Sequence, residues 1–197
     1  MSVIISLVRY TREQVETTRR RIVTAASRRF RAQGGPGAAI ATLMRDLKLT
    51  HGGFYRHFSS KDQLFEEALQ AAVEEMSGHM AAVAASAPAS GAVAAIVEAY
   101  LSDTHCEHPE RGCPLAALGT EIARLPRRSR DLCHRLLMAY ARRMARYMPG
   151  PTEAAREERA MLLFSGMAGT LTLARTITDT YARARLLAAA RAFYQTQ

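Results

Sequence analysis

The chain has 197 residues, of which 48% are hydrophobic and 23% are charged, a composition that excludes a disordered polymer and implies a packed core. Residues 1–61 hold twelve Lys and Arg against three Asp and Glu, whereas the other 136 residues hold 15 of each, so the whole net charge of +9 lies in the first part. Such asymmetry favours a polyanionic partner, either nucleic acid or an anionic surface, over a merely soluble basic surface.

The cysteine content and the apolar start of the chain bear on its compartment. Cys106, Cys113 and Cys133 are too few for a disulfide framework in a chain of this length, which favours a reducing compartment. The apolar stretch 3–8 is too short to span a bilayer, and no small-residue cleavage site accompanies it. We therefore expect a cytoplasmic protein with no membrane partner.

Helix-forming residues dominate the chain, and runs of β-branched residues are rare after residue 10, which predicts an all-α fold. In residues 11–33 the apolar side chains recur on one face of a helix, which the Gly-Gly-Pro-Gly cluster at 34–37 ends. A short second helix over 40–47 is followed by a tight turn at 48–50. A third helix then begins with Thr50 as its N-cap.

Longer helices are predicted after residue 60. Ser60 caps a fourth helix that begins at Lys61, and the Ala-, Ser- and Pro-containing stretch 85–91 predicts a loop. Apolar spacing then predicts helices over 93–101, 115–125 and 132–147, and two unusually apolar helices over 152–178 and 179–193. We expect about nine helices in all, divided between a domain of residues 1–61 and a second domain of residues 62–197.

The last two predicted helices carry apolar residues on more than one face, and a second copy of the chain is the simplest partner that would bury them. We expect a homodimer with a four-helix interface, in which glycines let two backbones approach closely. The expected interface residues are Leu163, Gly166, Met167, Gly169, Leu171, Ala174, Leu186, Leu187 and Ala190.

Residues 40–58 have the arrangement of a helix-turn-helix, in which two short helices flank a turn of about three or four residues. This arrangement lets the second helix place its amino-terminal end in a DNA major groove. Many helical corners with this pattern serve only packing, but the charge excess of residues 1–61 favours DNA binding.

Residues 49–64, with the sequence LTHGGFYRHFSSKDQL, strongly resemble the TetR family of bacterial regulators. Five earlier residues fit the same pattern, namely Ile22, Ala26, Phe30, Gly34 and Leu43. The resemblance covers residues 12–70 and implies an amino-terminal three-helix DNA-binding domain, followed by a helical domain for effector binding and dimerisation. The implied function is that of a ligand-responsive repressor, which binds a palindromic DNA operator as a homodimer and is released by a small effector.

The chemistry of five residues in this segment suits contact with DNA. Gly52 and Gly53 lack a Cβ atom, which permits close approach to the groove. Tyr55 and His57 have polar tips suited to phosphate oxygens, and Lys61 adds charge to a helix amino terminus that already favours an anion.

The resemblance assigns roles to these positions. It implies that Tyr55, His57 and Lys61 hold the DNA backbone while Thr50, His51 and Gly52 face base edges, with Gly53 beside them. The second helix supplies two weaker candidates, Thr42 and Arg45. The chain also departs from the pattern, because Ala38 and Ala39 replace the usual Ser or Thr, and Lys48 replaces a Gly. A left-handed conformation at Lys48 is therefore expected to be strained.

The segment 105–114, with the sequence HCEHPERGCP, concentrates thiols and imidazoles. Its Gly-Cys-Pro-Leu sequence looks like a subgroup of the same family in which a Cys begins the sixth helix. Because a helix amino terminus favours a thiolate, Cys113 or Cys106 is a candidate redox or electrophile sensor, and a small buried hydrophobe is the alternative. The spacing fits no standard zinc module, so we expect no metal and no cofactor.

A non-covalent pocket for an apolar effector is the other expectation. Its expected lining is Tyr100, Leu118, Met138, Tyr140, Phe164 and Met167, although each of these also suits a core. An enzyme that uses the Cys and His cluster is the competing class of function. The sequence has no Ser-His-Asp pattern, phosphate loop or paired-carboxylate signature, so we expect no enzyme. The sequence does not separate a repressor from an activator.

Overall fold

The computed structural model describes residues 12–34 and 40–196, with ten α-helices and three short 3-10 turns. The predicted apolar stretch 3–8, most of the glycine cluster, and Ala38 and Ala39 lie outside the described residues. The α-helices are α1 (Arg12–Gln33), α2 (Ile40–Asp46), α3 (Phe54–His57), α4 (Lys61–Ser86), α5 (Ala92–Tyr100), α6 (Asp103–Glu107), α7 (Pro114–Ala123), α8 (Arg127–Ala145), α9 (Glu153–Thr176) and α10 (Thr180–Gln195). The 3-10 turns are η1 (His51–Gly53), η2 (Ala89–Gly91) and η3 (Pro109–Arg111).

Side-chain caps explain where several helices begin. The Ser60 hydroxyl accepts a hydrogen bond from the Gln63 amide at 3.1 Å, and the Thr152 hydroxyl accepts one from the Ala155 amide at 3.1 Å. The Asp179 carboxylate accepts from two amides of the first turn of α10. Each cap satisfies amide groups that the helix itself leaves unpaired. The predicted start of the fourth helix at Ser60 is thereby confirmed.

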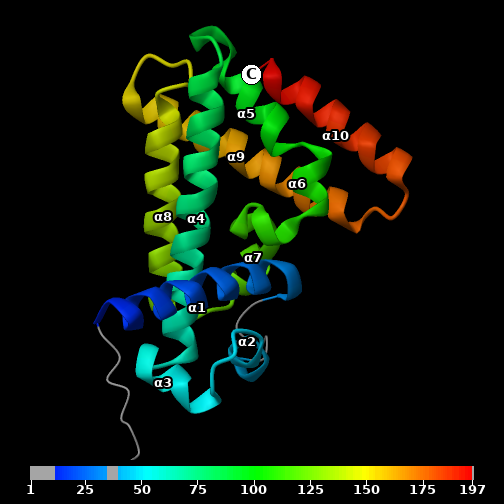
Figure 1. Ribbon diagram of the computed structural model, residues 1–197. Helices are drawn as coiled ribbons and strands as arrows, with labels where there is room; N and C mark the ends of the chain where they lie inside the picture. The colour runs from blue at the N-terminus through cyan, green and yellow to red at the C-terminus, as the bar shows by residue number, and fades with distance from the viewer. Residues whose placement is uncertain (1–11, 35–39, 197) are drawn as a thin grey trace, which may run out of the picture.

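The helices form two stacked parts, with α1 lying across the junction between them (Figure 1). On one side of α1 lie α2 and α3. On the other side α4 and α8 run side by side, and α9 and α10 pack against each other at the far side. The described residues contain no strand, and the predicted all-helical fold is confirmed. No helix in the described ranges is both long and apolar enough to cross a membrane.

Two separate hydrophobic cores lie within this arrangement. The amino-terminal core contains side chains of α1 to α4 together with Leu118, Ile122 and Cys133 of α7 and α8. The carboxyl-terminal core lies among α4, α5 and α8 to α10, with Cys106 and Cys113. Helix α4 contributes its first half to one core and its second half to the other, so it joins the two parts as one continuous rod.

Residues 50–58, which we call the recognition segment, follow a turn that shows the strain that the sequence predicts. Lys48 has a φ of 60°, a left-handed conformation that costs a non-glycine residue about 1–2 kcal/mol. The segment after it is less regular than one helix, because η1 precedes the four-residue α3. Helix α6 lies between the helices predicted over 93–101 and 115–125, where no helix was predicted. Its start is explained by the Ser102 hydroxyl, which accepts from the His105 amide at 3.2 Å.

Candidate DNA interface and effector core

The recognition segment presents its glycine to solvent and its phenylalanine to the core. A Cβ atom on Gly52 would meet nothing within 4 Å, so this backbone is open to an outside partner. Gly53 is held closer, because its amide donates to the Thr50 hydroxyl at 3.2 Å. Phe54 is buried while the next residue, Tyr55, is 64% exposed, with its ring edge-on to Phe54 at 5.2 Å between centroids. The buried Phe54 thus supports the outward-pointing Tyr55.

His57 is held in place by α1 rather than left free on the surface. The Arg19 guanidinium donates to the His57 carbonyl oxygen, pairs with Glu67 of α4, and lies 4.4 Å from the centroid of the Phe58 ring. Partial burial, with help from the nearby Arg19 and Arg56 charges, lowers the pKa of His57. A neutral imidazole can donate one hydrogen bond to a phosphate, but it adds no positive charge there.

Lys61 and Arg45 supply charge on either side of the recognition segment. Lys61 is exposed in the first turn of α4, where the helix dipole and the free amide groups already favour an anion. Arg45 on α2 is 77% exposed at its side chain and makes only a loose ion pair with Asp46, at 3.9 Å. Thr42 is half-buried, and the His51 side chain lies outside the described part of the chain. Among the other predicted contacts, Gly53 and His57 are half-buried, and the rest are exposed.

The predicted effector residues divide between the two cores. Tyr100, Tyr140, Phe164 and Met167 lie together in the carboxyl-terminal core, with Cys106 and Cys113. The Tyr140 and Phe164 rings are 4.8 Å apart between centroids, and the Tyr100 ring stands edge-on to Phe164 at 6.0 Å. Leu118 lies in the amino-terminal core instead. Met138 is half-buried and belongs to neither set of core residues.

The buried rings and thiols of this core leave little space between them. The space among Cys113, Cys133, Tyr140 and Phe164 is about 10 Å³, which holds at most one water molecule. The Tyr100 hydroxyl is fully buried and has no hydrogen-bond partner among the described residues. Burial, and then the neighbouring Cys113 thiol, raise the pKa of Tyr100 well above its ordinary value. An unpaired buried hydroxyl is costly, and the Cys113 thiol beside it is only a weak hydrogen-bond partner.

The thiols in this region are not activated. All three described cysteines are free and buried. Burial raises the pKa of the Cys113 thiol, and the same cause raises the pKa of Cys106 and of Cys133. Cys113 does stand at the start of α7, as predicted. Burial raises the pKa of its thiol more than the helix amino terminus lowers it. The structure therefore gives no support to a thiolate at Cys113 in this state.

An imidazole joins the two ends of the segment between α5 and α7. His105 Nδ1 donates to the Tyr100 carbonyl oxygen at 2.6 Å, and the Cys113 amide donates to His105 Nε2 at 2.8 Å. This pairing requires the neutral ring, and burial, with smaller effects of nearby cations, lowers the pKa of His105 to about 4. Gly112 makes the approach possible, because a Cβ atom there would stand 2.5 Å from the ring.

Arg31 connects this segment to the amino-terminal part. Its guanidinium, 1% exposed, donates to the Gly112 carbonyl oxygen at 2.7 Å and to the Glu75 carboxylate of α4 at 3.0 Å. Nothing in the sequence distinguishes Arg31 from the other arginines of α1. Its partners lie 44 and 81 residues away, so only the folded chain reveals the contact.

A cavity of about 460 Å³ opens beside the same segment. It lies between α4 and the α5–α6 region, and its lining includes Glu75, Met76, His79, Met80 and His105. Met76 and Met80 belong to the carboxyl-terminal core, so a molecule in this cavity touches that core directly. In the described ranges, no three His, Cys, Asp or Glu side chains gather closely enough to hold a metal ion.

The predicted dimer residues lie on α9 and α10, but several face inward. Met167, Leu171, Ala174 and Leu187 are buried in the core of the single chain, and a Cβ atom on Gly166 would collide with Tyr194. The half-buried members, Leu163, Leu186 and Ala190, pack on the same core. Gly169 faces open space. The large apolar side chains of α9 that are exposed are Leu162 and Leu173, at 73% and 61%.

Comparisons with known proteins agree with this geometry. Residues 22–68 match a family model described as bacterial regulatory proteins of the tetR family, while no curated protein matches the sequence. A TetR transcriptional regulator from Chloroflexus aurantiacus is 24% identical, with a TM-score of 0.76 over 93% of this chain and 95% of that chain. The reduced form of Escherichia coli NemR is 15% identical, with a TM-score of 0.71 over 88% and 95%. A TetR-family regulator from Cytophaga hutchinsonii is 14% identical, with a TM-score of 0.76 over 93% and 96%. The chain therefore has the fold of TetR-family transcriptional regulators, with a helix-turn-helix at its amino-terminal end.

Proposed function

We propose that the chain is a ligand-responsive repressor, which binds a palindromic operator as a homodimer and is released when a small effector binds its carboxyl-terminal part. The observation that carries this proposal is the Arg31 contact. It joins the helix that supports the recognition segment to the segment that closes the effector core. A change at one site therefore has a physical route to the other.

DNA recognition is assigned to the exposed recognition segment. Gly52 leaves room for the backbone to approach base edges, and Thr50 stands beside it. Tyr55 and His57 serve as hydrogen-bonding contacts to phosphates, while Lys61 and Arg45 add charge. His51 and Gly53 complete the contact surface, with Thr42 as a minor member.

Dimerisation is assigned to the outward face of α9. Leu162, Gly169 and Leu173 are spaced by seven and four residues, so they share one face of the helix. Leu162 and Leu173 are exposed, and Gly169 between them has open space around it. A second copy packed on this face would bury both leucines and approach closely at the glycine. Replacing Leu173 by Asp should then produce monomers in sedimentation, without the loss of folding expected for the buried Leu171.

Effector release is assigned to the cavity beside His105. A ligand there contacts Met76 and Met80, whose flexible side chains adapt readily to a new neighbour. Movement of His105 is transmitted through the Cys113 amide and Gly112 to Arg31, and so to α1. The effector need not react with a cysteine, since every described thiol is protonated at neutral pH. Release follows if the ligand-bound dimer holds its recognition segments at a spacing other than the 34–36 Å or so between successive major grooves.

Selection from genomic DNA tests the DNA-binding proposal. The purified full chain is used to enrich fragments, and the bound region is mapped by footprinting. We expect a palindrome with half-sites about one helical turn, or a multiple of it, apart. The Lys61→Ala variant should weaken binding to operator and scrambled DNA alike, whereas His51→Ala should change the preference between them. Lack of any enriched palindrome, or a Lys61→Ala effect restricted to sequence preference, would contradict the proposal.

A further inference from the structure

The amino-terminal part carries more positive charge than the residues assigned to DNA contact account for. Helix α1 alone carries Arg12, Arg19, Arg20, Arg21, Arg28, Arg29 and Arg31. Two of these point inward and are neutralised by carboxylates of α4, since Arg19 pairs with Glu67 and Arg31 with Glu75. The remaining arginines of α1 need a separate explanation.

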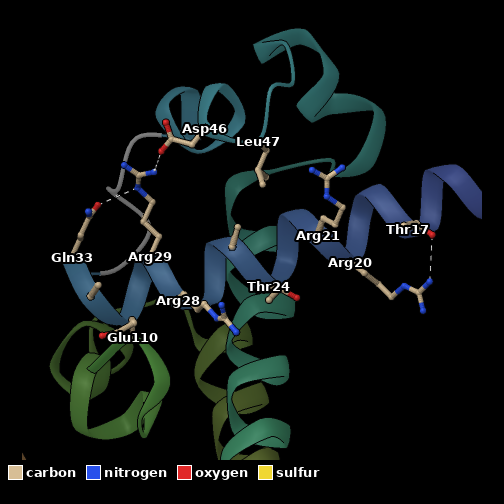
Figure 2. Close-up of a pocket in the computed structure, with 12 residues that line it drawn as sticks. Thr17, Arg20, Arg21, Thr24, Arg28, Arg29, Gln33, Asp46, Leu47 and Glu110 are labelled. Atoms are coloured by element: carbon tan, nitrogen blue, oxygen red, sulfur yellow. Dashed lines mark hydrogen bonds and ion pairs between the residues drawn. The ribbon is translucent and has the colours of Figure 1, made fainter. Parts of the chain in front are cut away.

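Four of them line an open groove, which we call the arginine groove. It has a volume of about 830 Å³ and is bordered by Arg20, Arg21, Arg28 and Arg29, with Asp46 and Leu47 on its far side. Figure 2 shows Arg29 reaching across to Asp46, with Arg21, Thr24 and Arg28 following one another along α1. The groove lies open to solvent along the helix rather than enclosed.

Three of the four arginines are not neutralised by the protein. Arg29 makes an ion pair with Asp46 at 2.7 Å. Arg20 donates only to the Thr17 hydroxyl at 3.4 Å. Within the described residues, Arg20, Arg21 and Arg28 have no carboxylate partner, and all three are exposed. Glu110, at one end of the groove, is already paired with His108.

The spacing of these charges suits an extended polyanion better than a small ligand. Arg21 and Arg28 are seven residues apart, which places them on one face of α1 about 10 Å from each other. That distance equals about three steps of the 3.4 Å axial rise of duplex DNA, so the two guanidinium groups can reach different phosphates of one duplex. The hydroxyls of Thr17 and Thr24 lie along the same face and can donate to phosphate oxygens. A small molecule in so open a groove would keep much of its surface in water.

We propose that the arginine groove binds the DNA phosphate backbone outside the half-site read by the recognition segment. Flanking duplex therefore adds affinity without adding sequence preference, and each contact adds to the salt dependence of binding. The inference rests on the proposed function, because it requires that the chain bind an operator. It assigns to Arg20, Arg21 and Arg28 a contact separate from those of Tyr55, His57 and Lys61.

Two duplexes and three variants test the groove. One duplex contains only the footprinted operator, and the other extends it by ten base pairs of arbitrary sequence on each side. Binding of the full-length protein to each is measured by fluorescence anisotropy over a series of salt concentrations. The test variant changes Arg20, Arg21 and Arg28 to Ala. The matched control changes Arg130, Arg135 and Arg143 of α8 to Ala, which removes the same charge from exposed positions elsewhere. A third variant carries Lys at positions 20, 21 and 28 and keeps the charge.

The result expected is specific to duplex length. On the extended duplex, the Ala variant should lose about 2 to 3 units from the slope of log affinity against log salt, at about 0.9 per phosphate contact. On the short duplex its affinity and slope should equal those of the unchanged protein. The control variant and the Lys variant should keep the slope on both duplexes.

Three results would overturn the inference. An unchanged slope for the Ala variant on the extended duplex would show that the groove does not bind DNA and would favour an acidic protein as its partner. An equal loss on the short duplex would show that the groove binds within the half-site. An equal loss in the control variant would show a general effect of net charge. Failure of the unchanged protein to prefer operator over scrambled DNA would instead contradict the proposed function. Circular dichroism melting of the Ala variant establishes that it is folded.

Discussion

The two hydrophobic cores of the molecule are built from different side chains. The amino-terminal core places Phe30, Phe54, Phe58 and Phe65 among aliphatic residues, with stacked Phe54 and Phe58 rings 5.5 Å apart. The carboxyl-terminal core has two phenols, two thiols and five methionines among its buried residues. Phenyl rings and branched chains favour one packed arrangement, whereas methionine side chains can adopt several. A buried hydroxyl without a partner can also accept a new hydrogen bond. The first core is suited to holding a fixed surface, and the second to adapting to a ligand.

Removing a ring from the amino-terminal core is the strongest test of this contrast. Phe54→Ala leaves a cavity beneath the recognition segment and should reduce the free energy of unfolding by about 3–5 kcal/mol, as measured in urea. The neighbouring Tyr55 provides the control, because it is exposed. Tyr55→Ala should change stability by less than about 0.5 kcal/mol yet weaken operator binding. Equal stability losses in the two variants would show that Tyr55 also belongs to the core.

A pH titration of stability tests whether the His105 ring is buried and neutral in the folded chain. The pKa of His105 falls from 6.5 to about 4 on folding, so the unfolded chain binds more protons between these values. Stability should be complete above pH 6.5 or so and should decline as the pH falls toward 4, by up to about 3 kcal/mol. Because the pKa of His57 is also lowered, the comparison is with His105→Gln. If the variant retained the full acid dependence, His105 would not be its source.

The contact between the two parts is tested at Arg31. Arg31→Met leaves the Gly112 carbonyl and Glu75 without this donor and should reduce the free energy of unfolding by about 1–3 kcal/mol. Arg29→Met is the matched control on the same helix, because its ion pair with Asp46 is more exposed and is worth about 1 kcal/mol or less. Hydrogen exchange should also quicken near Gly112 only in the Arg31 variant. Unchanged exchange there would mean that Arg31 does not couple the parts.

The smallest expected effect concerns the buried hydroxyl of Tyr100. Tyr100→Phe removes a buried group that has no hydrogen-bond partner among the described residues, so thermal unfolding should show a gain of about 1 kcal/mol. A loss of similar size would show that the hydroxyl is satisfied after all, by water or by the Cys113 thiol. The adaptability of this core would then rest on its methionines alone.

Features set by neighbouring residues could be predicted from the sequence. Ser60 caps α4 because its hydroxyl reaches an amide three residues on, and the composition of residues 40–60 indicates the helix-turn-helix. The left-handed Lys48 was predicted from the same segment. Local hydrogen bonding and backbone sterics decide these features, and both are visible in a short window of sequence.

Features set by distant residues could not be predicted. Periodicity identifies the apolar face of α9, but it does not say whether Leu171 meets its own chain or a second copy. In sequence, Arg31 looks like the other arginines of α1, and only the folded chain brings Gly112 and Glu75 into contact with it. Cys113 has the local setting of a thiolate, yet the surrounding core raises its pKa. In each case tertiary burial outweighs the local pattern.

A competition titration distinguishes sequence-specific DNA binding from binding to DNA charge alone. The full-length protein is titrated with labelled operator duplex in the presence of unlabelled operator, or of a scrambled duplex with the same length and composition, at one fixed salt concentration. We expect the operator to compete at least about 1,000 times more strongly than the scrambled duplex, which is the lower end of specific recognition by DNA-binding proteins. Equal competition by the two duplexes would show that the basic amino-terminal part binds polyanions only through its charge, and would contradict the assignment of a sequence-reading regulator.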